Sequence, residues 1–408
     1  MKDVDVVIVG AGLTGLRAAL EISRAGLAVL IIEKGDSVGG RVRTDRFEGF
    51  QLDHGFQVLL TAYPEYNLIP GFKNLQYGRF TAGARIWLGT EWRTFMDPIR
   101  ETAEFFKSLK APIASVTDLI KFAWYTQVLS GNDVSVINRS INQDLELIGF
   151  SARFLDSFVK PFLRGVLLDP SLSMDAGLAR FYLKTFSRGY AALPLNGIQA
   201  LPDLLAESLG REHIILNTPA LTLRTRGVTL ENGDDITARY VICACDALSA
   251  AALGGPEQTT PHASSTTLYF AADEPPYSEP IISLVGDGTG PINNLAVVSN
   301  VQPNYAPAGR ALISASVLGH AASLPEPELL EASRKHLYQI FGAQSADWEF
   351  IKSYRIPHSL PARPRVADGW IMHEDIYYAG DYLSYGSQNG ALKAGRLVGQ
   401  EVCREILE

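Results

Sequence analysis

The N-terminal segment contains the feature that most restricts the fold of this chain. Residues 4–9 are mostly apolar and β-branched, as in a parallel strand buried on both faces. They lead directly into the sequence GAGLTG at residues 10–15, and residues 13–25 carry apolar side chains at helical spacing. Residues 27–33 form a second apolar run. A strand, a glycine turn, a helix and a strand in this order predict a βαβ unit that binds a dinucleotide.

Each glycine of this motif has its own expected role. Gly10 permits a tight turn, Gly12 lets a pyrophosphate approach the backbone, and Gly15 lets the helix pack closely on the sheet. The helix N-terminus offers free N–H groups and the positive end of its dipole to the phosphates. Glu33, eighteen residues after Gly15, can bind both hydroxyls of a ribose and would repel a 2′-phosphate. These residues favour FAD or NAD over NADP.

The composition argues against several other classes of protein. The chain has 408 residues, which suits two or three domains, and its net charge is -8. We expect no nucleic-acid partner, because basic residues are not concentrated anywhere. Seven scattered histidines and three cysteines have no metal-binding spacing, so no metal is expected. No apolar run is long enough to span a membrane, and the N-terminus enters a strand directly; we expect a protein of the cytoplasm or of an organelle stroma.

A second glycine pair follows shortly after the acidic residue. Lys34 begins a segment that contains Gly39-Gly40-Arg41. This arrangement resembles the signature of the flavin-containing amine oxidase superfamily, which includes monoamine oxidases, protoporphyrinogen oxidases and phytoene-type carotenoid desaturases. The resemblance implies that the dinucleotide is FAD. The two glycines would then let a loop run along the extended cofactor, and Arg41 would approach its phosphates.

Later segments resemble the same superfamily in the same order. Residues 52–57 look like the segment that lies against the isoalloxazine ring, and a residue at the place of Ala220 meets the adenine through its backbone in relatives. Residues 377–395 resemble the final FAD-binding segment, and no cysteine lies beside them, so the FAD is expected to be non-covalent. The resemblance implies cofactor contacts from Gly55, Phe56, Gln57, Val58, Gly380, Asp381, Gln388, Asn389, Gly390 and Ala391.

These blocks predict an α/β protein with two discontinuous domains. A Rossmann-type FAD-binding domain is expected from residues 1–76, 190–262 and 350–408. The intervening residues 77–189 and 263–349 are expected to form an inserted α+β substrate domain, by resemblance to the same superfamily.

The first insertion, 77–189, carries the helix signals and the second carries strand signals. Residues 115–118 (SVTD) read as a capping box with Asp in place of the usual Glu. Phe154, Phe158 and Phe162 are spaced by four, which predicts core packing or, by the resemblance, the lining of a substrate cavity.

The expected chemistry is hydride transfer from a substrate to the flavin, which carries the difficult step. Gln57, Tyr385 and Ser387 are the candidates for residues that face the flavin. Amine oxidases of the monoamine type place an aromatic residue where this chain has Ser387, which disfavours a small amine. The sequence does not locate the lysine that these enzymes hold near the reactive flavin nitrogen; Lys352 is a guess.

The substrate stays open at this point. Residues 158–167 and 348–361 resemble segments of protoporphyrinogen oxidases and carotenoid desaturases. The first expectation is therefore a dehydrogenase, desaturase or oxidase of a hydrophobic, isoprenoid or tetrapyrrole-like molecule, with oxygen or a quinone as electron acceptor. Aromatic residues in the helical insertion also suggest peripheral contact with a membrane. The alternatives are an amine or amino-acid oxidase, and a flavoprotein without turnover.

Overall fold

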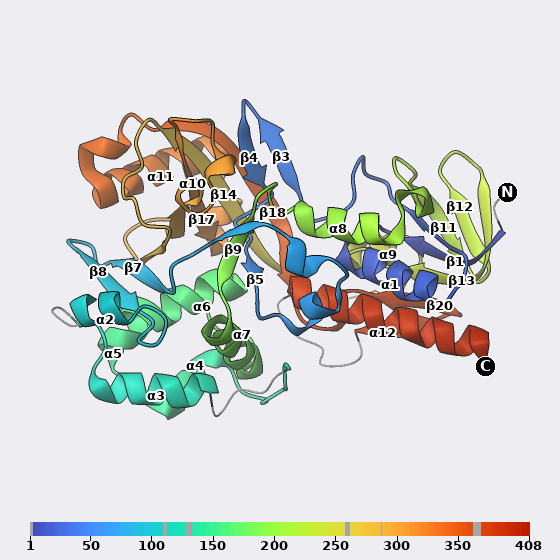
Figure 1. The fold of residues 1–408 in the computed structure, drawn as a ribbon, viewed down its shortest axis with the longest axis horizontal. Helices are drawn as coiled ribbons and strands as arrows, with labels where there is room; N and C mark the ends of the chain where they lie inside the picture. Colours follow the sequence, from blue (N-terminus) through green and yellow to red (C-terminus); the bar gives the residue numbers. More distant parts are fainter. Residues whose placement is uncertain (1–2, 109–111, 128–132, 258–261, 287, 362–368) are drawn as a thin grey trace.

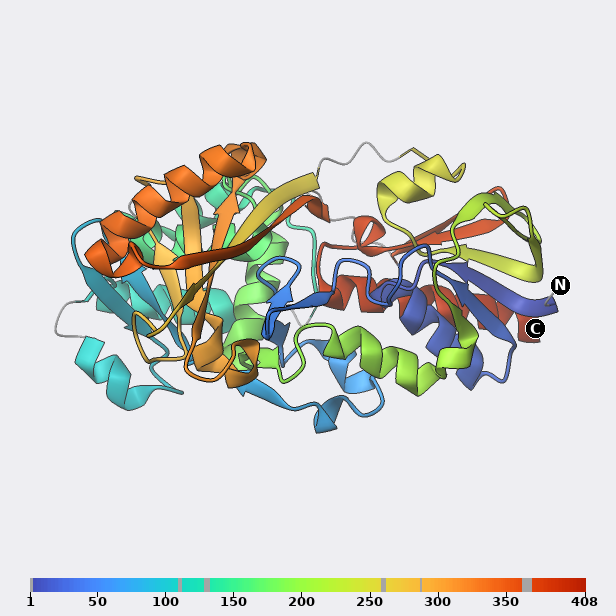
Figure 2. The ribbon, with the colours of Figure 1, turned by 90° about the horizontal axis from the view of Figure 1, so that it is seen from above.

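The computed structural model describes residues 3–108, 112–127, 133–257, 262–286, 288–361 and 369–408. They fold into two bodies, each built around a sheet, which lie side by side along the long axis of the molecule (Figures 1 and 2). The first strand and the last helix of the chain lie together at one end (Figure 1). The predicted α/β class is confirmed.

The first sheet has a parallel centre in the order β10-β2-β1-β13-β20, as the βαβ pattern predicted. Antiparallel strands continue it on one side, and the residues in the middle of β1 and β2 are fully buried. The strands are β1 (Asp3–Val9), β2 (Val29–Ile32), β10 (Ile214–Ile215), β11 (Ala220–Arg224), β12 (Gly227–Leu230), β13 (Asp235–Cys243), β19 (Trp370–His373) and β20 (Ile376–Ala379).

Two helices from opposite ends of the chain pack closely on this sheet. A Cβ atom on Gly395 would lie 2.2 Å from the carbonyl oxygen of Thr14, and one on Gly399 would lie 2.9 Å from that of Ala18. Glycines one turn apart therefore let the last helix approach the first along its backbone, which brings both to the glycine turn. The helices of this body are α1 (Leu13–Arg24), α8 (Ala200–Leu209), α9 (Ala247–Ala252) and α12 (Gln388–Leu407).

The second sheet has seven strands in the order β18-β14-β17-β16-β15-β7-β8. Helix α11 (Glu326–Phe341) packs on one face through Leu329, Leu337 and Ile340. The strands indicated by the sequence of the second insertion are confirmed, as β14 to β17. The strands are β7 (Gly83–Trp87), β8 (Trp92–Met96), β14 (His262–Ala272), β15 (Ile282–Val285), β16 (Ile292–Val297), β17 (Ala311–Leu318) and β18 (Glu349–Pro361).

A layer of helices from the first insertion lies against the other side of this sheet (Figure 1). The predicted capping box is confirmed: the backbone N–H of Asp118 donates to Ser115 Oγ, and that of Ser115 donates to Asp118 Oδ2. The helices are α2 (Thr102–Ser108), α3 (Val116–Gln127), α4 (Ile141–Ile148), α5 (Ala152–Phe154), the π-helical turn η3 (Leu155–Val159), α6 (Lys160–Leu167) and α7 (Ala176–Arg188).

Small sheets and one long strand join the two bodies. Strand β18 pairs with β14 in the second sheet, although the range expected for the FAD-binding domain resumes at residue 350. We therefore propose that this domain resumes after Pro361. Among the described residues no helix has the length and apolar character to cross a membrane. The remaining elements of this region include β3 (Thr44–Phe47), β4 (Phe50–Asp53), β5 (Leu59–Leu60), β6 (Tyr77–Arg79), β9 (Ala191–Pro194), η1 (Pro64–Leu68) and α10 (Val298–Val301).

Candidate active site

The glycine turn after β1 has three different local geometries. Gly10 has a φ of +105°, which disfavours any residue with a side chain. A Cβ atom on Gly15 would lie 2.0 Å from the carbonyl oxygen of Gly10, so α1 can pack on the turn only through glycine. A Cβ atom on Gly12 would meet nothing within 4 Å and would project into a large cavity. The turn is thus closed at Gly10 and Gly15 and open at Gly12, where a phosphate has room.

Glu33 lies at the end of β2 and lines the same cavity. Its Oε2 accepts a hydrogen bond from the backbone N–H of Ala11 at 2.7 Å, and its Oε1 accepts one from Gly35 at 2.7 Å. The carboxylate is therefore held in a fixed position beside the glycine turn. Its remaining lone pairs are placed to accept hydrogen bonds from ribose hydroxyls.

Arg41 links three distant segments across the cavity wall. It donates from Nη2 to Asp381 Oδ1 at 2.6 Å and from Nη1 to the carbonyl oxygen of Ser359 at 2.6 Å. Desolvation lowers the pKa of Arg41, but attraction and hydrogen bonding to Asp381, together with attraction to Asp246, outweigh it and leave that pKa above its usual value. The guanidinium is thus charged and anchored, which suits the neighbourhood of a pyrophosphate.

A chain of side-chain amides runs along the wall between these segments. Gln57 donates from Nε2 to the carbonyl oxygens of Arg41, at 2.7 Å, and His54, at 3.0 Å. Gln388 donates from Nε2 to Gln57 Oε1 at 3.4 Å, and its own Oε1 accepts from the hydroxyl of Tyr66. The phenol therefore orients the amide of Gln388, whereas two backbone carbonyl oxygens fix the amide of Gln57.

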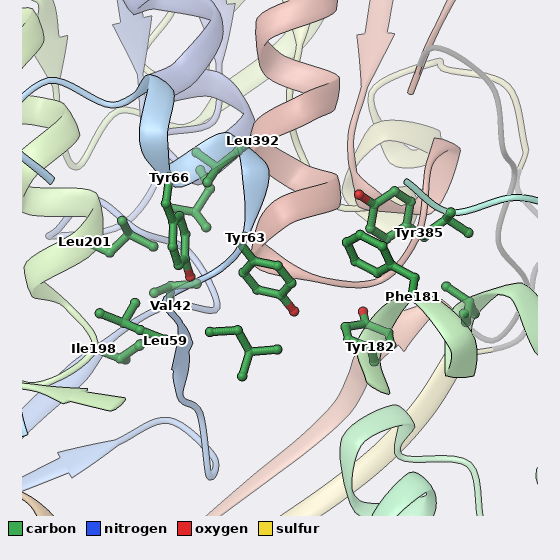
Figure 3. Packing of buried hydrophobic residues seen from close by; sticks show 14 of the residues in the cluster. Val42, Leu59, Tyr63, Tyr66, Phe181, Tyr182, Ile198, Leu201, Tyr385 and Leu392 are labelled. Atoms are coloured by element: carbon green, nitrogen blue, oxygen red, sulfur yellow. The ribbon is translucent and has the colours of Figure 1, made fainter. Parts of the chain in front are cut away.

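The first turn of α12 is capped by a side chain that also lines the cavity. Ser387 Oγ accepts a hydrogen bond from the backbone N–H of Gly390 at 2.8 Å. Asn389 points away from the cavity and donates to the hydroxyl of Tyr385 at 2.6 Å. The ring of Tyr385 packs against Phe181 at 5.6 Å between ring centres (Figure 3). The loop thus turns Ser387 toward the cavity and buries Tyr385.

The cavity has a volume of about 1140 Å³, somewhat more than the ~300–1,000 Å³ of a typical ligand site. Of the residues singled out in the sequence, Gly15, Asn389, Gly390 and Tyr385 do not belong to its lining, and Lys352 instead contacts Asp45 outside it, at 3.1 Å. The lining includes Gly10, Gly12, Glu33, Lys34, Gly39, Gly40, Arg41, Gly55, Phe56, Gln57, Val58, Ala220, Gly380, Asp381, Ser387, Gln388 and Ala391.

The second half of the cavity lies between the helical layer and the second sheet. Phe158 and Phe162 line it with rings stacked at 5.6 Å, whereas Phe154 is fully buried in the core behind them. Of the three phenylalanines spaced by four, two thus line the cavity and one packs in the core, which are the two roles considered from the sequence. Tyr182 also lines the cavity and donates to the carbonyl oxygen of Gly386 at 2.8 Å. Burial raises the pKa of Tyr182 to about 12, so the phenol is neutral.

Several lining residues were not singled out in the sequence. Tyr63 belongs to an aromatic group with Tyr182 and Phe181 beside α12 (Figure 3). Thr267 of β14 accepts a hydrogen bond from the backbone N–H of Phe56 at 3.1 Å, which joins the second sheet to the segment expected under the flavin. Isolated tyrosines and threonines carry no motif, and only the pairing of distant strands places them here.

Comparison with known proteins agrees with this geometry. A 4,4'-diaponeurosporene oxygenase of Staphylococcus haemolyticus is 21% identical over 59% of this chain, and the match covers 55% of that relative's length. A protein of Exiguobacterium sp. 255-15, provisionally described as a protoporphyrinogen oxidase, superposes with a TM-score of 0.73 at 18% identity, covering 99% of this chain and all of the other. Cyclohexylamine oxidase of Brevibacterium oxydans superposes with a TM-score of 0.71 at 18% identity, with both chains fully covered.

The fold and the cavity define a protein that binds a dinucleotide at the end of a parallel sheet. The apolar second half of the same cavity faces this site. The sequence model of the flavin-containing amine oxidoreductases matches residues 13–403, and the chain belongs to this family. Its cofactor is FAD. The residues present fit that molecule, because the open space at Gly12, the fixed carboxylate of Glu33 and the charged Arg41 follow one another along one cavity.

Proposed function

We propose that the protein is an FAD-dependent oxidoreductase that takes a hydride from an uncharged, hydrophobic substrate of isoprenoid or tetrapyrrole-like character. The observation that supports this most is the lining of the substrate half of the cavity. Its wall is built from aromatic and aliphatic side chains of the helical layer and of strand β8. The apolar members of this wall include Phe95, Leu119, Phe122, Phe158, Phe162, Val166 and Phe186.

The charges in this half of the cavity support a neutral substrate. Among the described lining residues of 77–189 and 263–349, Asp97 and Arg100 are the charged ones. They bind each other, with Arg100 Nη2 donating to Asp97 Oδ2 at 2.8 Å, so the carboxylate is already paired. An ammonium substrate would need an anionic or aromatic partner at the flavin, and the position expected to carry the aromatic residue is Ser387. The cavity thus offers little to a small amine.

The residues of this chain would position the substrate rather than exchange protons with it. FAD supplies the hydride acceptor when it is bound, and no acid or base is required for that step. Gln57 and Ser387 would face the flavin, Tyr182 would order the loop at Gly386 through its hydrogen bond, and the aromatic wall would exclude water. Oxygen or a quinone would then accept the electrons.

Anaerobic flavin bleaching tests this proposal. The purified holoprotein is mixed in the absence of oxygen with isoprenoids, porphyrinogens, polyamines or amino acids, and the absorbance of oxidised flavin is followed. We expect loss of absorbance with an apolar substrate. Loss with amines alone would overturn the proposal in favour of an amine oxidase, and no loss with any class would favour a flavoprotein without turnover. Mixing the reduced protein with oxygen or a quinone identifies the acceptor.

We further propose that the apolar substrate is taken up from a lipid surface at helix α3. Val116, Ile120 and Trp124, spaced by four along α3, are 74%, 66% and 46% exposed, while Leu119 and Phe122 of the same helix line the cavity. Helix α3 is therefore apolar on both faces, and its outer face is not covered by the part of the chain that the structure describes. Figure 1 places α3 at the end of the molecule remote from the parallel sheet.

Flotation with phosphatidylcholine vesicles tests this contact. The double variant Ile120→Ser, Trp124→Ser is expected to lose most of the vesicle-bound fraction. Leu221→Ser is the control, because Leu221 is 57% exposed on the parallel-sheet body. Wild-type protein that does not float, or an equal loss in the control, would contradict a specific contact at α3.

A further inference from the structure

A row of polar side chains crosses the floor of the otherwise apolar half of the cavity. Thr267 of β14 is the register partner of Ser316 of β17, which is in turn the partner of Asn294 of β16. The row ends on Leu284 of β15, the partner of Asn294. All four residues line the cavity. Because neighbouring strands lie ~4.8 Å apart, Asn294 is roughly 10 Å across the sheet from Thr267.

The near end of this row marks the flavin side. Thr267 Oγ1 accepts the hydrogen bond from Phe56, which belongs to the segment expected against the isoalloxazine ring. The other end lies where α6 closes on the sheet. A Cβ atom on Gly165 would lie 3.1 Å from Asn294 Oδ1, so the α6 backbone approaches this amide as closely as glycine allows. The pair formed by Asn294 and Ser316 therefore lies in the part of the apolar half of the cavity that is remote from the flavin side.

This pair has hydrogen-bonding capacity to spare. Asn294 Oδ1 accepts from Asn293 Nδ2 at 3.0 Å, and Asn294 Nδ2 donates to Ser316 Oγ at 3.3 Å. That leaves the second N–H of Asn294 and the hydroxyl proton of Ser316, for which the part of the chain that the structure describes supplies no acceptor. Asn294 is 3% exposed and Ser316 is 5% exposed. Because both side chains line the cavity, these two donors are placed to bind one acceptor there.

We propose that Asn294 and Ser316 form a subsite for a neutral oxygen, a carbonyl or hydroxyl group, on an elongated apolar substrate. The inference rests on the proposed function and narrows its substrate class. The aromatic roof of Phe158 and Phe162 holds the hydrocarbon part, and the polar pair binds the oxygen one to two strand spacings from the flavin side. A carboxylate is disfavoured, because the charged lining residues of this half are the mutually paired Asp97 and Arg100.

Equilibrium binding of two matched probes to the holoprotein tests the subsite. Geranylacetone is an isoprenoid ketone, and farnesene is an isoprenoid hydrocarbon of similar length. Wild-type protein is expected to bind the ketone about tenfold more tightly, which corresponds to roughly 1.4 kcal/mol. In Asn294→Leu the ratio of the two dissociation constants should fall to about one, and in Ser316→Ala it should fall to about three, with little change for the hydrocarbon.

Ser314→Ala is the matched control. Ser314 lies two residues earlier on β17 and is fully buried, but it does not line the cavity, so its loss should leave the ratio unchanged. Equal affinities in wild-type protein, no binding of either probe, or a ratio kept in both subsite variants would overturn the inference. Preference for the ketone that disappears in Asn294→Leu, together with no flavin bleaching by any substrate class, would keep the subsite and overturn the proposed oxidoreductase alone.

Discussion

At the scale of single residues, Gly12 differs from its neighbours because its missing side chain leaves space in the cavity rather than in the protein core. Gly12 has a φ of -70°, which any residue adopts, and a Cβ atom there meets nothing within 4 Å. Gly12→Val should therefore fold normally but lose FAD, since the branched side chain occupies the space expected for phosphate. The flavin absorbance of the purified variant, beside its far-ultraviolet circular dichroism, measures this. Full FAD content would refute the placement of the phosphates, and Gly12→Ala should be intermediate.

Tyr66 is a second residue whose role depends on one atom. Its ring is fully buried against Phe72, and its hydroxyl orients Gln388, which in turn donates to Gln57. Tyr66→Phe keeps the ring and removes the donor, so the amide of Gln388 can reorient along the cavity wall. We expect FAD to bind about 5- to 10-fold more weakly, as for the loss of one buried hydrogen bond, with a shifted flavin reduction potential.

The control for this variant is Tyr377→Phe. The hydroxyl of Tyr377 bonds to Glu405 outside the cavity, so its removal should leave FAD affinity and potential unchanged. Equal FAD affinity and equal potential in Tyr66→Phe and wild-type protein would show that the phenol does not orient the amide of Gln388.

At the scale of elements, local chemistry was predictable and distant pairing was not. The βαβ unit and the capping box at residues 115–118 follow from residues that are neighbours in the sequence. The same Asp118 also binds Ser151, which no spacing rule could predict across such a separation. Likewise, the polar row through Asn294 exists only because of the register between β16 and β17. Tyr385 was expected to face the flavin, but its ring packs against Phe181 and does not line the cavity. Spacing in the sequence cannot show which side of a loop faces a cavity.

Asp118 holds helix α3 in place at the cavity wall. It accepts hydrogen bonds from the backbone and hydroxyl groups of Ser115 and of Ser151, at 2.7 to 2.9 Å. Asp118→Ala keeps the bond from its backbone N–H to Ser115 Oγ but removes the reciprocal half of the capping box and the link to α5, and should destabilise this layer by about 2 kcal/mol. Amide hydrogen exchange in residues 116–127 should become roughly 30-fold faster. Unchanged exchange there, with α12 as the internal reference, would mean that packing alone holds the helix.

At the scale of the whole molecule, one buried carboxyl group joins both bodies. Asp53 Oδ1 accepts hydrogen bonds from Thr44 Oγ1 at 2.6 Å and from the backbone N–H of Ile198 at 3.0 Å, and its Oδ2 accepts from Tyr305 at 2.8 Å. Tyr269 of the second sheet also donates to its carbonyl oxygen, at 3.0 Å. Segments from four parts of the chain therefore meet at this residue, which is 2% exposed.

The protonation of Asp53 should make the stability of the whole protein depend on pH. Desolvation raises the pKa of Asp53 to about 6 in the folded state, although its three hydrogen bonds oppose the shift. The folded state then holds the proton more tightly than the unfolded state, so the stabilisation is complete below pH ~3.9 and is lost as the pH rises through about 6. A difference of about two pKa units corresponds to roughly 3 kcal/mol at neutral pH.

Asp53→Asn keeps the acceptor for Thr44 and Ile198, offers an N–H to the phenol oxygen of Tyr305, and does not titrate. The free energy of unfolding of Asp53→Asn, relative to wild-type protein, should therefore increase between pH 4.5 and 7.5, as measured by urea denaturation of the holoprotein. Parallel pH profiles of the two proteins would show that Asp53 is ionised in the folded state throughout this range.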